Sequence, residues 1–270
     1  MPKPRVLILR APGTNCDVET AVAFARAGGE PERLHINRLL ENPRRFDQYQ
    51  ILCLPGGFSY GDDVAAGKIL ANQIRHHLRD AVFRFRDAGK LILGICNGFQ
   101  VLIKCDVLIE PSPAGPLATL TYNDSGRFED RWVRLGVTGR DCPFLEGIES
   151  LELPVAHGEG KFVARDLAAL AALEAAGQLV LRYRPREAGS LGGSGPKPGV
   201  PAGPTPHPDN PNGSMADVAG VCDASGRVLG LMPHPERHID PIQHPRWTRG
   251  DAGADGAGLK LFVNAVRSFA

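Results

Sequence analysis

The sequence predicts an α/β fold with a central, mostly parallel sheet, helices on both faces and a small antiparallel addition. Short apolar runs alternate with amphipathic segments over the first hundred residues, which is the order of parallel βαβ units. One of these runs, Lys90–Ile95, enters a glycine-containing turn and is followed by apolar residues at helical spacing. Beyond residue 110 the strand-like segments alternate apolar and polar residues, as half-exposed antiparallel strands do.

The composition restricts the class of protein. A chain of 270 residues with 43% hydrophobic residues can bury a sizeable core, so disorder of the whole chain is excluded. The net charge is +1, which gives no general attraction to nucleic acid or to an anionic membrane. We therefore expect a single domain over residues 1–270, with no nucleic-acid partner and no membrane association.

Cysteine usage and the N-terminus indicate a cytoplasmic protein. None of the six cysteines forms a C-x-x-C pair, which argues against a zinc ribbon or thioredoxin chemistry. Several lie in or beside apolar runs, as reduced cysteines do. The first apolar run is only five residues long, too short for a signal peptide, and no run approaches the length of a membrane span.

The secondary-structure elements are predicted from hydrophobic periodicity and from the turn-forming residues between the periodic segments. The predicted strands are 5–9, 33–37, 50–55, 90–95, 117–122, 131–137, 151–156, 178–183, 217–222 and 228–233. The predicted helices are 18–28, 69–85, 99–103, 167–176 and 259–269. Residues 117–160 supply the antiparallel addition. The segment 186–211 is rich in Gly and Pro and nearly lacks large apolar side chains, so we predict a mobile insertion within the domain.

Cys96 is the candidate nucleophile. It stands between Gly94 and Gly98 where a predicted strand meets a predicted helix, which is the thiol form of the nucleophile elbow. Such a turn presents the sulfur at the carboxyl edge of the sheet, and a helix N-terminus there favours the thiolate. The alternative is a buried structural cysteine, because free cysteines are often simply buried.

His234 and Glu236 are the candidate base and its orienting group. They follow the apolar run Val228–Leu231, and in an extended segment residues two apart point the same way. Glu236 could then hold the imidazole while His234 faces Cys96. His238 and His244 are rival bases on sequence alone.

A glycine-rich loop follows another predicted strand. Pro55–Asp63 contains adjacent glycines, which let backbone N–H groups turn toward a ligand, although an ordinary βα loop would look similar. No Walker phosphate loop occurs here.

These motifs together resemble the class I (triad) glutamine amidotransferases, which have a flavodoxin-like fold. Within that class the chain most resembles the glutaminase subunits of phosphoribosylformylglycinamidine synthase, and the resemblance covers essentially the whole chain. The motifs that carry it are 13–17 (GTNCD), 55–62 (PGGFSYGD), 94–100 (GICNGFQ), 157–160 (HGEG), 210–214 (NPNGS) and 230–237 (GLMPHPER). The segment from about Ala188 to Thr205 departs from the compact pattern of the family.

The resemblance implies a reaction and a set of roles. Glutamine would be hydrolysed to glutamate and ammonia by a triad of Cys96, His234 and Glu236. Ammonia would pass to a synthetase subunit that uses ATP and Mg²⁺ to make formylglycinamidine ribonucleotide in purine biosynthesis, and a small accessory subunit could be part of the complex. The glutaminase subunit itself would hold no cofactor or metal. The implied oxyanion and substrate-binding residues are Gly56, Gly57, Phe58, Asn97, Gln100 and His157.

Three other functions stay open at this point. The chain could serve a different synthetase, or it could be a cysteine hydrolase of a related fold, which would not need the segment Pro233–Glu236. It could also be a non-enzymatic binding subunit. Cys16 is not expected to be a second nucleophile, because no further His-x-Glu pair remains to serve it.

Overall fold

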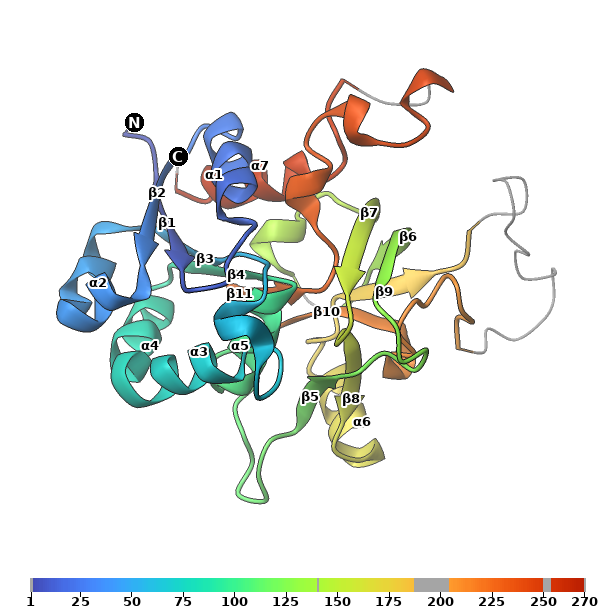
Figure 1. The fold of residues 1–270 in the computed structure, drawn as a ribbon, viewed down its shortest axis with the longest axis horizontal. Helices are drawn as coiled ribbons and strands as arrows, with labels where there is room; N and C mark the ends of the chain where they lie inside the picture. Colours follow the sequence, from blue (N-terminus) through green and yellow to red (C-terminus); the bar gives the residue numbers. More distant parts are fainter. Residues whose placement is uncertain (1, 140, 187–203, 250–253, 270) are drawn as a thin grey trace.

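The computed structural model describes residues 2–139, 141–186, 204–249 and 254–269 (Figure 1). Its main sheet has nine strands in the order β2-β1-β3-β4-β11-β10-β9-β6-β7. The strands are β1 (Arg5–Arg10), β2 (Glu30–His35), β3 (Ile51–Leu54), β4 (Leu91–Ile95), β6 (Glu129–Val137), β7 (Ser150–His157), β9 (Leu181–Arg184), β10 (Val218–Cys222) and β11 (Val228–Leu231).

The sheet has a parallel half and an antiparallel half. Strands β2, β1, β3, β4 and β11 pair parallel with one another. The residues of β3, β4 and β11 are all buried, which explains their uninterrupted apolar sequences. From β11 onward β10, β9, β6 and β7 pair antiparallel, and β10 and β11 form the predicted hairpin.

Helices cover both faces of the parallel half (Figure 1). On one side α1 (Asp17–Arg26) packs against α7 (Leu259–Arg267), where the rings of Phe24 and Phe262 meet edge to face at 4.9 Å. On the other side lie α3 (Lys68–Gln73), α4 (Arg79–Asp87) and α5 (Asn97–Lys104). The remaining α-helices among the described residues are α2 (Ile36–Glu41) and α6 (Leu167–Ala175). No helix in the described ranges is long and apolar enough to span a bilayer.

The antiparallel addition expected from residues 117–160 is divided between two sheets. β5 (Ala118–Thr121) pairs with β8 (Lys161–Ala164) in a separate two-stranded sheet. β6 and β7 instead extend the main sheet, because β6 pairs with β9 on its other side. β8 was not predicted.

Three further expectations need adjustment. The second strand ends at His35, before the predicted 37, because the His35 side chain accepts the Asn37 N–H and caps α2. The long helix predicted over 69–85 is interrupted by a π-helical turn at Ile74–Leu78. Within the predicted insertion, residues 187–203 lie outside the described part of the chain. Thr205 and Asn210 are buried and hydrogen-bonded to Asp217, so these two residues are not part of a mobile loop.

Candidate active site

The turn around Cys96 is a strained elbow. Cys96 follows β4 and precedes α5, with φ of 50° and ψ of −104°, a combination that L residues rarely adopt. A Cβ on Gly98 would lie 1.8 Å from the carbonyl oxygen of Leu54, and a Cβ on Gly94 would lie 2.7 Å from that of Gly98. The G-x-C-x-G spacing is therefore required by the close approach of three backbone segments.

Adjacent parallel strands bring Cys96 and His234 to one edge of the sheet. Ile95 of β4 is in register with Leu231 of β11, and the Cys96 N–H donates to the Leu231 carbonyl at 2.8 Å. His234 stands three residues beyond β11, and its N–H donates to the carbonyl of Pro154 in β7 at 2.8 Å. The backbone of His234 is thus held by a third strand.

His234 and Glu236 form a buried pair. Nδ1 of His234 lies 2.6 Å from Oε1 of Glu236, and the two residues are 2% and 1% exposed. Burial opposes charging of the imidazole. Even so, the negative charge of Glu236 and the contacts with Cys96 and Cys16 raise the pKa of His234 well above its ordinary value. The structure therefore brings together the three residues that the sequence predicted as a triad.

The rival bases lie elsewhere. The rings of His238 and His244 pack edge to face on Trp132, at 4.9 and 4.6 Å between centroids. Nδ1 of His238 is 2.8 Å from the carbonyl oxygen of Glu152. These histidines belong to a cluster over β6 and β7, so neither is the partner of Cys96.

A pocket of about 210 Å³ opens in front of Cys96. The predicted residues Gly57, Phe58, Gln100 and His157 all line it. Gly56 instead packs on the base, because a Cβ there would lie 2.8 Å from Cε1 of His234. Other lining residues were not predicted from the sequence, namely Asp62, Ala66, Tyr122, Phe128, Ala156, Gly158 and Glu159. Glu159 stands inside the motif HGEG, and Asp62 ends the motif PGGFSYGD, so those motifs could have indicated both.

Two backbone N–H groups near the thiol have no acceptor within the described residues, those of Gly57 and Asn97. Gly57 has φ of 143° and a Cβ there would lie 2.7 Å from the Gly13 carbonyl oxygen, so only glycine fits. Asn97 is the first residue of α5, where a backbone N–H has no partner inside the helix. Its side chain donates to Gln100 Oε1 at 2.9 Å and to Asp62 Oδ1 at 3.1 Å.

His157 supports the pocket as a neutral side chain. It is 2% exposed, and burial together with the neighbouring His234 lowers its pKa to about 3. Its Nδ1 lies 3.1 Å from Oδ1 of Asn123, which also accepts the Gly160 N–H at 3.0 Å. Asn123 was not found from the sequence, since no motif marks it.

Cys16 adjoins His234. Ligand atoms of Cys16, Glu19, His234 and Glu236 lie within 4.8 Å of one another, the spacing of a possible metal site. Arg237 occupies the same region, however, with Nη2 at 3.3 Å from Cys16 Sγ and Nε at 3.0 Å from Glu19. A guanidinium at that position disfavours a bound cation.

Comparisons with known proteins agree with this geometry. A family model described as a CobB/CobQ-like glutamine amidotransferase domain matches residues 3–269. The phosphoribosylformylglycinamidine synthase subunit PurQ of Dehalococcoides mccartyi is 46% identical, over 99% of this chain and 98% of that protein. The PurQ subunit of a Methanococcus maripaludis strain is 38% identical, over 98% and 97%.

Solved structures give the same result. The structure of PurLQS from Thermotoga maritima contains a chain that is 31% identical, with a TM-score of 0.71 and 99% coverage of both chains. A glutamine amidotransferase of the same organism, at 17% identity and a TM-score of 0.52, shares the fold. The chain belongs to the CobB/CobQ-like glutamine amidotransferase family and, within it, to the PurQ subunits of phosphoribosylformylglycinamidine synthase.

Proposed function

We propose that Cys96, His234 and Glu236 hydrolyse glutamine to glutamate and ammonia. Cys96 Sγ attacks the carboxamide carbon of glutamine, and His234 accepts the thiol proton and returns it to the departing ammonia. Water then hydrolyses the thioester. The observation that carries the proposal is the buried 2.6 Å His–Glu pair next to a strained cysteine elbow.

The N–H groups of Gly57 and Asn97 are the proposed oxyanion hole. Both lack an acceptor among the described residues. Gly57 lines the pocket in front of the thiol, and Asn97 directly follows Cys96 in the chain. Loss of one such donor typically costs about 3–4 kcal/mol of transition-state stabilisation. Phe58, Gln100 and His157 would position the glutamine.

The ammonia acceptor is proposed to be bound by a synthetase subunit. Phe58, Tyr122 and Phe128 line the pocket and are exposed, which supports a partner covering its mouth. The similar chain in the Thermotoga complex bears a title that names a PurLQS assembly. We propose that such a synthetase and a small accessory subunit bind this chain in the cytoplasm, and that ATP and Mg²⁺ bind to the synthetase.

The test is glutamate release by this chain, alone and mixed with the synthetase subunit, formylglycinamide ribonucleotide and Mg-ATP. Stimulation by the partner that disappears with Cys96→Ala, while ammonia-dependent synthesis survives, is the expected result. Cys105→Ala, a buried cysteine at the end of α5, is the matched control. Loss of ammonia-dependent synthesis with Cys96→Ala would contradict a role limited to ammonia supply. Glutamate release that the synthetase subunit does not change would point to a different ammonia acceptor.

A further inference from the structure

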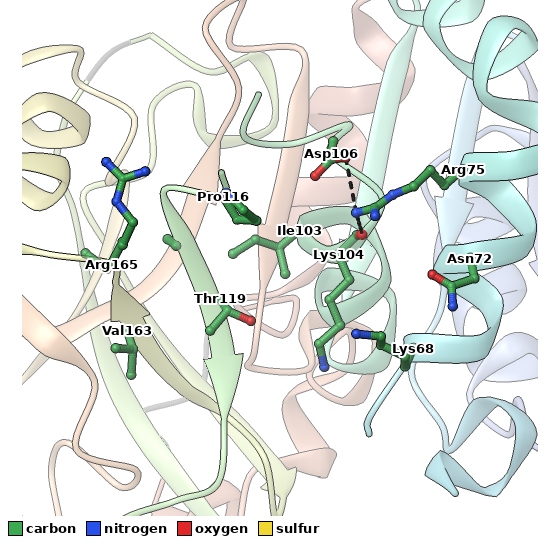
Figure 2. Close-up of a pocket in the computed structure, with 12 residues that line it drawn as sticks. Lys68, Asn72, Arg75, Ile103, Lys104, Asp106, Pro116, Thr119, Val163 and Arg165 are labelled. Atoms are coloured by element: carbon green, nitrogen blue, oxygen red, sulfur yellow. Dashed lines mark hydrogen bonds and ion pairs between the residues drawn. The ribbon is translucent and has the colours of Figure 1, made fainter. Parts of the chain in front are cut away.

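A second cavity, of about 470 Å³, lies between α3, α5 and the small β5–β8 sheet (Figure 2). Its volume is within the range of small-molecule sites. Four cationic side chains line it against a single carboxylate, that of Asp106. The cations are Lys68, Arg75, Lys104 and Arg165.

The single carboxylate does not neutralise this charge. Asp106 is already paired with Arg75 at 3.1 Å. The Lys68 ammonium has neither an ion pair nor a hydrogen bond among the residues described, and the amide of Asn72 beside it is also without a partner there. Figure 2 shows the ammonium groups of Lys68 and Lys104 directed into the same part of the cavity. Burial lowers the pKa of Lys104, and the positive charge of Lys68 lowers it further. The negative charges of Glu159 and Asp62 raise it, but the net shift is downward.

Apart from Thr119, the rest of the lining is apolar. Ile103, Pro116, Ala118, Val163 and Ala164 form the walls away from the two lysines. An anionic group between Lys68 and Lys104 would relieve their repulsion, while the walls would contact an uncharged body. We propose that this cavity binds a small phosphate monoester with a flat or apolar body, and that its occupancy changes the affinity of the active site for glutamine.

The link to the glutamine pocket is a short chain of hydrogen bonds. The Lys104 ammonium donates to the carbonyl of Ala66, whose own N–H donates to Oε2 of Glu159 at 3.3 Å. The side-chain amide of Gln100 donates to the Glu159 carbonyl. Ala66, Gln100 and Glu159 line the pocket in front of Cys96. A phosphate that draws Lys104 away from Ala66 would therefore displace a wall of that pocket.

The first experiment measures binding by calorimetry on the full chain at low salt, with phenyl phosphate as the probe and phenol as the uncharged control. We expect one site for phenyl phosphate and none for phenol. Lys68→Ala should weaken binding about tenfold or more, the loss expected for one charge-assisted hydrogen bond. Lys68 is exposed, so the variant should fold, and the exposed Lys3→Ala is the matched control. Absence of binding at about 10 mM probe, or equal binding by Lys68→Ala, would overturn the proposal.

The second experiment measures the KM for glutamine with and without phenyl phosphate, and it rests on the proposed glutaminase function. A probe-dependent change in KM that Lys68→Ala abolishes is expected, whereas an unchanged KM at saturating probe would refute the coupling. Binding with no glutaminase activity at all would instead refute the proposed function and leave the binding site standing. If Lys68→Ala weakened only the association with the synthetase, the cavity would be a partner contact and the proposal would be wrong.

Discussion

Glu236 Oε1 lies 2.6 Å from Nδ1 of His234, two residues earlier in the chain, and both side chains are almost completely buried. The carboxylate holds the ring at Nδ1, and Nε2 has no hydrogen-bond partner among the described residues. Glu236 therefore determines both the orientation and the protonation of the His234 imidazole.

Glu236→Gln keeps a hydrogen-bonding side chain but removes the negative charge. We expect kcat for glutamate release to fall about 10²–10⁴-fold, as when other triads lose the carboxylate. Because Glu236 raises the pKa of His234, the variant should also lower the pKa of the base seen in the pH profile of kcat/KM. The profile can be measured from pH 5 to 9. An unchanged profile with full activity would favour a cysteine hydrolase that does not use this carboxylate.

The same charge affects stability. In the folded state the pKa of His234 is raised above its unfolded value of about 6.5. The stabilisation of the fold by the charged His234–Glu236 pair is therefore fully present below pH 6.5. It is lost as the pH rises through the folded-state pKa of His234. Urea unfolding of the wild type and Glu236→Gln should therefore differ more at pH 6 than at high pH. A difference that does not depend on pH would contradict this assignment.

Gly98→Ala should damage both the fold and the elbow. The added Cβ would lie 1.8 Å from the Leu54 carbonyl oxygen, so β3 or α5 must move. We expect a loss of about 3 kcal/mol in the free energy of unfolding, measured by urea denaturation, together with loss of activity. Gly126→Ala is the control, since nothing lies within 4 Å of a Cβ there and only its φ of 63° is unfavourable. An equal loss in the free energy of unfolding for the two variants would show that the close approach of Gly98 to Leu54 is unimportant.

His157→Gln should flatten the acid side of the stability curve. In the wild type the unfolded chain protonates this histidine below about pH 6.5, whereas the folded chain does so only near pH 3. Stability should therefore fall by about 1.4 kcal/mol per pH unit on acidification through this window. We expect the variant to lose this slope between pH 6.5 and 5 in urea titrations. The exposed His77→Gln is the control, and an identical slope for His157→Gln and wild type would contradict a buried neutral His157.

Cys16 should resist alkylation although it touches His234. Burial raises the pKa of its thiol to about 11 against the opposing effect of His234, so only roughly one part in a thousand or less is thiolate at pH 7.5. Treatment with iodoacetamide followed by peptide mass analysis should find Cys96 modified and Cys16 unmodified. The Cys96→Ala variant is the control for background labelling. Faster alkylation of Cys16 than of Cys96 would reopen its assignment as a nucleophile.

The elements around the triad could be predicted because their signals are local. A strand, a glycine pair and a helix within ten residues identify Cys96, and two apolar strands with a short turn identify the hairpin that leads to His234. The register that makes them neighbours follows from parallel strands ending at one edge. Local sequence therefore determines most of the proposed catalytic centre.

The walls of the pocket and the far half of the sheet could not be predicted in the same way. Asn123 acts through contacts with backbone that is distant in the sequence, and it lies in no periodic segment. β6 and β7 carry the alternation of any antiparallel strand, so their place in the main sheet depends on whether β9 pairs with β6. This pairing forms only in the folded chain, and the sequences of β6 and β9 do not indicate it.

The pairing of Gly94 with Gly230 also has a consequence for biosynthesis. Ribosomes add about 5–20 residues per second, so Cys96 is made roughly 10 s before His234. Until Val228–Leu231 has emerged, one edge of β4 has no partner, and an edge of this kind is where chaperones or other chains attach. A nascent or cleaved chain that stops short of His234 carries the cysteine but not the other two members of the proposed triad. Ammonia production by this protein would thus begin only after translation has passed that point.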